Sequence, residues 1–126
     1  MVVFGLPRRT VLIVDDNQQI RSLLSNVLST WGYPVATAGN GAEALDYLKG
    51  NPTPGLILLD LGMPEVNGWQ YLDRRRHDPR LADIPVVVLS GYSEIARGTL
   101  DAEGVQCLDK PVDPRVLLEL AARYCD

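Results

Sequence analysis

The sequence is poor in the residues that bind transition metals or cross-link chains. It has only 2 cysteines, Cys107 and Cys125, and 1 histidine, and it contains no C-x-x-C pair. A structural zinc site is therefore excluded, because such sites need four closely spaced sulfur or nitrogen ligands. Two isolated cysteines in 126 residues also make no disulfide framework, so free thiols in a reducing compartment are expected.

Long hydrophobic runs and an excess of positive charge are lacking as well. No apolar run approaches the roughly 18 residues that a membrane helix needs. The arginines near the start follow an apolar stretch, which reverses the order found in a signal peptide. With 12 Lys and Arg against 16 Asp and Glu, the net charge of −4 gives no basic footprint for nucleic acids or anionic lipids. We therefore expect a cytoplasmic protein without membrane insertion or direct nucleic acid binding.

What the chain does have is a regular succession of short apolar runs. Its length fits one domain, expected over residues 1–126 with a core at about 9–125 and no effector domain. Three runs bounded by Pro, Gly or Asp are typical of parallel strands covered on both faces, and two weaker runs fit the same role. In chain order, the expected strands are 11–14, 34–38, 56–59, 86–89 and 105–108.

Apolar residues at three- and four-residue spacing fill the gaps between these strands and predict helices. The expected helices are about 18–31, 41–49, 68–77, 94–103 and 114–124. We expect Trp31 and Trp69, which fall on this spacing, to pack in the interior, and Cys125 to lie at a frayed end. Strict strand–helix alternation predicts a doubly wound (βα)5 α/β fold with a five-stranded parallel sheet.

Polar residues follow the expected strands at their carboxyl ends, where ligands bind in such sheets. They comprise three carboxylates, one hydroxyl and one ammonium, from Asp15, Asp16, Asp60, Ser90 and Lys110. Each Asp or Ser alone is better explained as a helix N-cap. Five such residues at the same edge are not, and a lysine cannot cap a helix start.

Carboxylates gathered this closely repel one another and need compensation. A pair at ~4 Å costs on the order of 4 kcal/mol at an effective dielectric near 20. Lys110 supplies one positive charge, and a hard divalent cation such as Mg²⁺, which prefers oxygen ligands, would supply the rest. A carboxylate beside Mg²⁺, with Lys and Ser nearby, can accept a phosphoryl group as a nucleophile.

Taken together, these motifs resemble the receiver domain of two-component response regulators, chemotaxis receivers included. The resemblance covers about residues 9–125, and each motif falls in its expected place after a strand. The motifs are Asp15-Asp16, Asp60-Leu61-Gly62-Met63-Pro64 with Asn67-Gly68, Ser90-Gly91 and Lys110-Pro111. The resemblance implies a flavodoxin-like sheet of order 2-1-3-4-5.

The resemblance also implies a role for each matching residue. Asp60 corresponds to the phosphoacceptor, which takes a phosphoryl group from a sensor histidine kinase or a histidine phosphotransfer protein. Lys110 corresponds to the lysine that pairs with a phosphoryl oxygen, through a cis Lys110–Pro111 bond. Ser90 corresponds to the hydroxyl that bonds another phosphoryl oxygen. The implied Mg²⁺ ligands are Asp15 acting through water, Asp16, Asp60 and the backbone carbonyl of Gly62.

Partners follow from the same resemblance. The polar face of the first helix, with Arg21 and Ser22, is expected to contact the phosphodonor. A downstream effector is expected at the surface made by the helix expected at 94–103, the strand expected at 105–108 and the helix expected at 114–124. Cys107 departs from the family, which usually has an aromatic residue there, so we expect the switch to act through Ser90 and Tyr92.

Alternative functions remain open at this point. The chain could be the receiver domain of a hybrid histidine kinase or of a longer regulator. A phosphatase of the haloacid dehalogenase type also uses an aspartate nucleophile, but it needs a carboxylate where this chain has Gly62. A pseudo-receiver without chemistry is disfavoured by the intact acidic residues and Lys110. We expect no enzyme beyond catalysis of its own phosphorylation and dephosphorylation.

Overall fold

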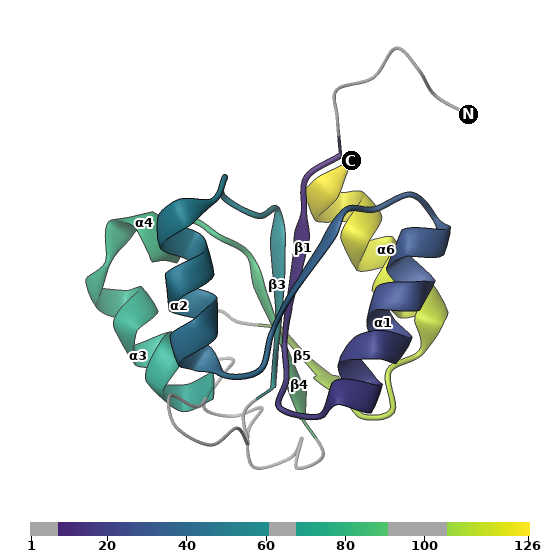
Figure 1. Ribbon diagram of the computed structural model, residues 1–126, viewed down its shortest axis with the longest axis horizontal. Helices are drawn as coiled ribbons and strands as arrows, with labels where there is room; N and C mark the ends of the chain where they lie inside the picture. The colour runs from purple at the N-terminus through teal and green to yellow at the C-terminus, as the bar shows by residue number, and fades with distance from the viewer. Residues whose placement is uncertain (1–7, 61–67, 91–105) are drawn as a thin grey trace.

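The computed structural model describes residues 8–60, 68–90 and 106–126. Within these ranges five parallel strands form one sheet in the order β2-β1-β3-β4-β5 (Figure 1). The strands are β1 Val11–Val14, β2 Val35–Ala38, β3 Leu56–Asp60, β4 Val86–Ser90 and β5 Gln106–Asp109. The expected fold class and strand order are therefore confirmed.

Helices lie on both faces of this sheet. They are α1 Gln18–Thr30, α2 Gly41–Gly50, α3 Gly68–His77, α4 Pro79–Ala82 and α6 Pro114–Cys125. Figure 1 shows α1 and α6 on one face and α2, α3 and α4 on the other. The helix expected at 94–103 lies outside the described residues. None of the described helices is long and apolar enough to cross a membrane.

Side-chain caps explain where four of the helices begin. Asn17, Asn40, Asp78 and Asp113 each accept a hydrogen bond from a main-chain N–H in the first turn of the following helix. Such caps satisfy donors that have no partner inside the helix. The first helix ends where Gly32 adopts φ 87°, a backbone conformation that favours glycine.

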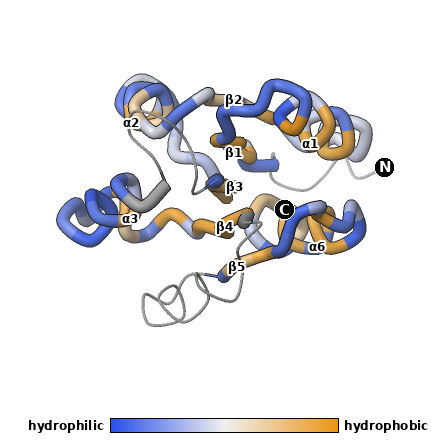
Figure 2. The backbone as a smooth tube through the Cα atoms, turned by 90° about the horizontal axis from the view of Figure 1, so that it is seen from below, coloured by the Kyte–Doolittle hydropathy of each residue, from blue (hydrophilic) through white to orange (hydrophobic). Residues whose placement is uncertain are grey.

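The core follows the alternation of side chains along the strands. Leu12 and Val14 point towards α2, α3 and α4, whereas Val11 and Ile13 point towards α1 and α6. Successive side chains of β3 and β4 also point alternately to the two faces of the sheet, so each of these strands is apolar on both faces. Figure 2 shows the result as hydrophobic colour along β1 and β4 between helices with hydrophilic outer sides.

Three local expectations were incomplete or wrong. The short helix α4 was not expected, although Asp78-Pro79 is a cap followed by a first-turn proline. Trp31 was expected to pack, but 62% of it is exposed. It is the C-cap of α1, so it has left the helical spacing that the expectation relied on. Cys125 was placed at a frayed end, but it is fully buried. The side chain of Trp69 lies outside the described part of the chain.

Candidate functional site

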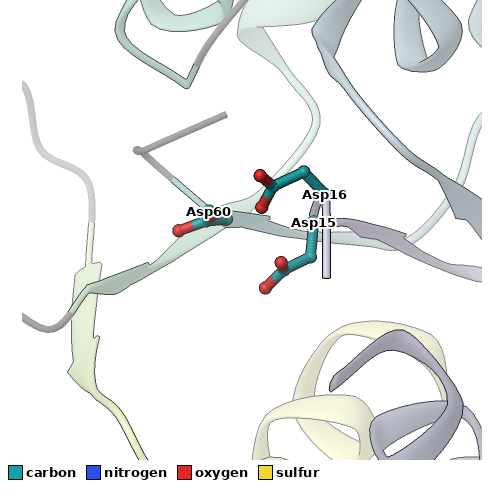
Figure 3. Close-up of side chains that lie close together, drawn as sticks. All are labelled: Asp15, Asp16 and Asp60. Atoms are coloured by element: carbon teal, nitrogen blue, oxygen red, sulfur yellow. The ribbon is translucent and has the colours of Figure 1, made fainter. Parts of the chain in front are cut away.

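Three carboxylates meet at the carboxyl edge of the sheet. Asp15 and Asp16 directly follow β1, and Asp60 is the last residue of β3, the strand that pairs with β1. Oxygen atoms from the three side chains lie within 4.8 Å of one another. In Figure 3 the carboxylates of Asp15 and Asp16 extend from the end of β1 to the side on which Asp60 lies. Parallel pairing of two adjacent strands thus brings together residues that are far apart in the sequence.

Lys110 joins two of these carboxylates. Its Nζ donates to Asp60 Oδ1 at 3.1 Å and to Asp15 Oδ2 at 3.2 Å. Lys110 follows β5 directly, and the Lys110–Pro111 bond is cis, as the resemblance implied. The structure therefore brings together Asp15, Asp16, Asp60 and Lys110, four of the five residues that the strand ends predicted to meet.

The electrostatics of Asp15 are dominated by burial. Only 1% of the residue is exposed. Burial raises the pKa of Asp15, and the nearby charge of Asp60 raises it as well. A hydrogen bond from the Asn17 main-chain N–H to Asp15 Oδ1, at 2.9 Å, and the charge of Lys110 act in the opposite direction without cancelling it. Asp15 is thus a buried carboxylate whose two oxygens already have partners, Asn17 and Lys110.

The surroundings of Lys110 raise its pKa, which keeps the ammonium charged. Burial alone would lower the pKa of Lys110, but the charges of Asp60 and Asp15 and their hydrogen bonds outweigh burial and raise it. The ammonium therefore stays protonated at neutral pH. With one ammonium among three carboxylates, the cluster keeps an excess of negative charge.

The remaining expected site residues are only partly described. Ser90 ends β4 and pairs with Asp109 of β5, which places its backbone at the same edge of the sheet. Its side chain, like Gly62 and Tyr92, lies outside the described residues. Cys107 is half-buried and packs against the core beneath α2, α3 and α4.

Two residues around the acidic cluster were not assigned to it from the sequence. Asn17 caps α1 and also donates its main-chain N–H to Asp15. Arg21, which is expected to contact a partner, also donates through Nη1 to the main-chain oxygen of Asp15 at 2.6 Å. The available signal was spacing, because a long cation in the first turns of a helix can reach back to the residues before it.

Fold and site together define a doubly wound α/β domain with an acidic cluster at the edge where such domains bind ligands. Over residues 11–122 the sequence matches the response regulator receiver domain, and the chain belongs to that family.

Individual relatives agree with this membership. Chemotaxis protein CheY1 of Helicobacter pylori is 34% identical over 113 residues, 86% of this chain and 90% of that protein. The structure of chemotaxis protein CheY4 of Vibrio cholerae is 30% identical, with a TM-score of 0.81 over 93% of this chain and 98% of that one. The signal receiver domain of a histidine kinase from Syntrophus aciditrophicus is 29% identical, with a TM-score of 0.79 over 92% and 89% of the two chains.

Proposed function

We propose that this protein is a phospho-accepting switch of a two-component phosphorelay, with Asp60 as the phosphoacceptor. The observation that carries the proposal is the position of Asp60. It ends a central strand, is 7% exposed, lies 3.1 Å from the ammonium of Lys110, and has two further carboxylates beside it. Family membership supports the same role. A carboxylate in this setting is a nucleophile with a cation ready for the charge of an incoming phosphoryl group.

The acidic cluster fits Mg²⁺ as the cofactor. Its donors are carboxylate oxygens, the ligands that this ion prefers, and one ammonium does not balance three carboxylates. Asp16, which is exposed, and Asp60 would bind directly. Asp15 would act through water, because both its oxygens already accept hydrogen bonds. The Gly62 carbonyl is the proposed backbone ligand. The ion would supply positive charge for the phosphoryl oxygens.

The transfer step follows from these positions. A carboxylate oxygen of Asp60 attacks the phosphorus of a phosphohistidine and forms a new O–P bond. The P–N bond breaks, and its electron pair remains on the imidazole nitrogen of the donor. Lys110, already within hydrogen-bond distance of Asp60, holds one oxygen of the transferred group. Ser90, at the end of the next strand, is proposed to bond another.

An apolar groove beside Lys110 supports a helical phosphodonor, either a histidine kinase or a histidine phosphotransfer protein. The groove has a volume of about 290 Å³. It is lined by Ile20, Leu23, Leu24, Leu89, Lys110, Pro111 and Val112. Leu23 is 63% exposed at its rim. A helix with apolar anchors could dock here and bring its histidine to the acidic edge.

The output is proposed to be a change in the surface that includes β5 and α6, read by a downstream effector in the cytoplasm. The partly buried thiol of Cys107 lies on β5 and faces the core on the α2, α3 and α4 side of the sheet, opposite α6. Because Cys107 has no ring to rotate, Ser90 and the segment after it would transmit the change. A domain of a hybrid kinase is the alternative setting, supported by the likeness to a receiver domain of a histidine kinase.

Intact mass spectrometry tests the phosphoacceptor. After incubation with Mg²⁺ and acetyl phosphate, the wild type should gain the mass of one phosphoryl group and Asp60→Asn none. An equal adduct on both would reject Asp60. Steady hydrolysis of a phosphate ester, instead of one stoichiometric adduct, would favour the aspartate-nucleophile phosphatase and overturn the proposal that the protein acts only on its own phosphoryl group.

A second experiment tests the docking groove. Leu23→Glu should slow transfer from the cognate kinase and leave labelling by acetyl phosphate unchanged. Trp31→Glu is the matched control, because Trp31 is equally exposed, at 62% against 63%, but is the C-cap of α1 and does not line the groove. Equal slowing by both variants would reject docking at the groove.

A further inference from the structure

Arg21 connects α1 to the strand end that carries two of the acidic residues. It lies in the first turns of α1 and is half-buried. Its main-chain N–H donates to the Asn17 oxygen at 3.0 Å, and its Nη1 donates to the Asp15 main-chain oxygen at 2.6 Å. The side chain thus turns back from the helix onto the residue that begins the acidic cluster.

The hydrogen bond from Arg21 completes the partners of Asp15. The Asp15 main-chain N–H donates to Ala38 at 3.1 Å. Its two carboxylate oxygens accept from Asn17 and Lys110. Arg21 supplies the donor for the remaining group, the carbonyl oxygen. That oxygen belongs to the planar peptide unit that joins Asp15 to Asp16, so holding it fixes the direction from which Asp16 leaves the strand.

The guanidinium of Arg21 also lies close to Gly39, just before the start of α2. A methyl group at Gly39 would lie 3.6 Å from Arg21 Nη1 and 3.4 Å from Glu43 Oε2. Glu43 Oε1 in turn accepts from the Gly39 main-chain N–H at 3.0 Å. The arginine is therefore confined between two corners of the fold, one after β1 and one after β2.

We propose that Arg21 is a positioning residue of the Mg²⁺ site, which holds the Asp15–Asp16 peptide unit so that the Asp16 carboxylate faces Asp60. The inference rests on the proposed function, because it assumes that the acidic cluster binds Mg²⁺. Partners that orient metal ligands commonly contribute 10-fold or more to metal affinity.

Charge and position predict opposite results when Arg21 is removed. A cation beside three carboxylates repels Mg²⁺, so charge alone predicts tighter Mg²⁺ binding by Arg21→Ala. Positioning predicts weaker binding, because the Asp15–Asp16 unit is no longer held. The sign of the change therefore separates the two effects in a variant whose amide spectrum without Mg²⁺ shows that it is folded, because partial unfolding would also weaken apparent binding.

The experiment is a Mg²⁺ titration of the full chain, followed by amide chemical shifts of residues around Asp16 and Asp60. Arg21→Ala should raise the dissociation constant by about 10-fold. Arg21→Lys should recover part of the loss, because its ammonium can still donate to the carbonyl. Lys49→Ala is the control, since it removes the same charge from the exposed end of α2. It should leave Mg²⁺ binding unchanged.

Each outcome decides the matter. Unchanged or tighter Mg²⁺ binding by Arg21→Ala would overturn the positioning role. If Arg21→Ala does not fold, Arg21→Lys and Arg21→Gln take its place. Wild-type Mg²⁺ affinity in both variants would then reject the positioning role of Arg21. A wild type that binds no Mg²⁺ would overturn both this role and the metal site. A wild type that binds Mg²⁺ but is not labelled by acetyl phosphate would overturn the proposed function and leave the role of Arg21 standing.

Discussion

The two ends of the parallel sheet use charge in opposite ways. At the carboxyl end, Asp15 is 1% and Asp60 7% exposed, and one lysine serves both. At the amino end, Arg8 pairs with Asp126 at 3.3 Å with side chains 40% and 47% exposed. The first end holds an unbalanced group of charges in which two of the three carboxylates are buried, and the second holds a balanced pair exposed to solvent. Buried imbalance is costly and indicates function, whereas an exposed pair adds little to stability.

The amino end is instead held by packing and main-chain contacts. The main-chain N–H of Arg9 donates to Cys125 at 2.8 Å, which ties the end of α6 to the chain before β1. A methyl group at Gly55 would lie 2.7 Å from the Tyr124 main-chain oxygen and 2.9 Å from Cys125 Sγ. Only glycine permits this approach. Each of the following predictions tests the contrast between the two ends.

The largest effect should come from removing the cation at the carboxyl end. Lys110→Met leaves three carboxylates without their ammonium. Breaking a buried pair by removing one partner costs about 3–5 kcal/mol, and because Lys110 is 25% exposed we expect about 2–3. Melting temperatures in EDTA should therefore fall by about 10 °C.

Added Mg²⁺ should reduce this deficit, because it replaces the lost positive charge. Lowering the pH should also reduce it, because Asp15, whose pKa is raised, is protonated at a higher pH than an ordinary Asp. Arg115→Met is the control, since it breaks a pair whose arginine side chain is 88% exposed. An equal fall in melting temperature for Lys110→Met and Arg115→Met would contradict the view that the buried charges at the carboxyl end matter more than exposed pairs.

At the amino end, the pH dependence of stability should come from a buried thiol. Burial raises the pKa of Cys125 to about 11. In the unfolded chain a thiol titrates near 8.5, so between these values the unfolded chain gives up its proton while the folded chain keeps it. Rising pH therefore favours unfolding, by about 2 kcal/mol between neutral pH and pH 10.

Denaturant titrations at several pH values isolate this effect. The wild type should lose more stability than Cys125→Ala between neutral pH and pH 10, whatever the cost of the substitution at neutral pH. Cys107→Ala, at the half-buried cysteine, should follow the wild type. Parallel curves for the wild type and Cys125→Ala would show that the thiol is not protected by the fold.

The third effect is a gain in stability. Asp60→Asn removes one of three crowded carboxylates while Lys110 keeps Asp15 as a partner. Without Mg²⁺ we expect a melting temperature higher by a few degrees, equivalent to about 1 kcal/mol. The gain should shrink as Mg²⁺ is added. A lower melting temperature in EDTA would mean that the ion pair with Lys110 outweighs the repulsion.

Much of this arrangement was predictable from local sequence. The strands were predicted because their apolar runs are short and bounded by Pro, Gly or Asp. The meeting of Asp15, Asp16, Asp60 and Lys110 follows from parallel strands, whose carboxyl ends share one edge. These predictions needed only periodicity and topology.

What the sequence did not predict depends on contacts between distant segments. In the sequence Trp31 continues the apolar spacing of α1, but the helix ends before it, the chain turns at Gly32, and the Trp31 main-chain oxygen accepts a hydrogen bond from Arg8. Cys125 is buried because the end of α6 meets Gly55 and the chain before β1. The polar face of α1 explains the position of Arg21 in the sequence. It does not show whether the side chain contacts a partner or Asp15. Hydrophobic periodicity predicts which face of a helix or strand is apolar. It does not predict which long polar side chain, such as that of Arg21, folds back onto its own chain.

The smallest effect is expected at the exposed ion pair of the amino end. Arg8→Ala removes the pair with Asp126, the hydrogen bond to the Trp31 main-chain oxygen and the guanidinium that stacks on the Tyr33 ring, 4.2 Å from its centroid. The Tyr33 ring is buried, but the charged side chains of Arg8 and Asp126 are 40% and 47% exposed, so the loss should be about 1 kcal/mol. Thermal unfolding should show a change of only a few degrees, and added salt should reduce the contribution of the ion pair further. Asp126→Asn separates these contacts, because it removes the ion pair and leaves the stacking in place. A loss as large as that of Lys110→Met would contradict the view that burial, and not the number of ion pairs, distinguishes the two ends.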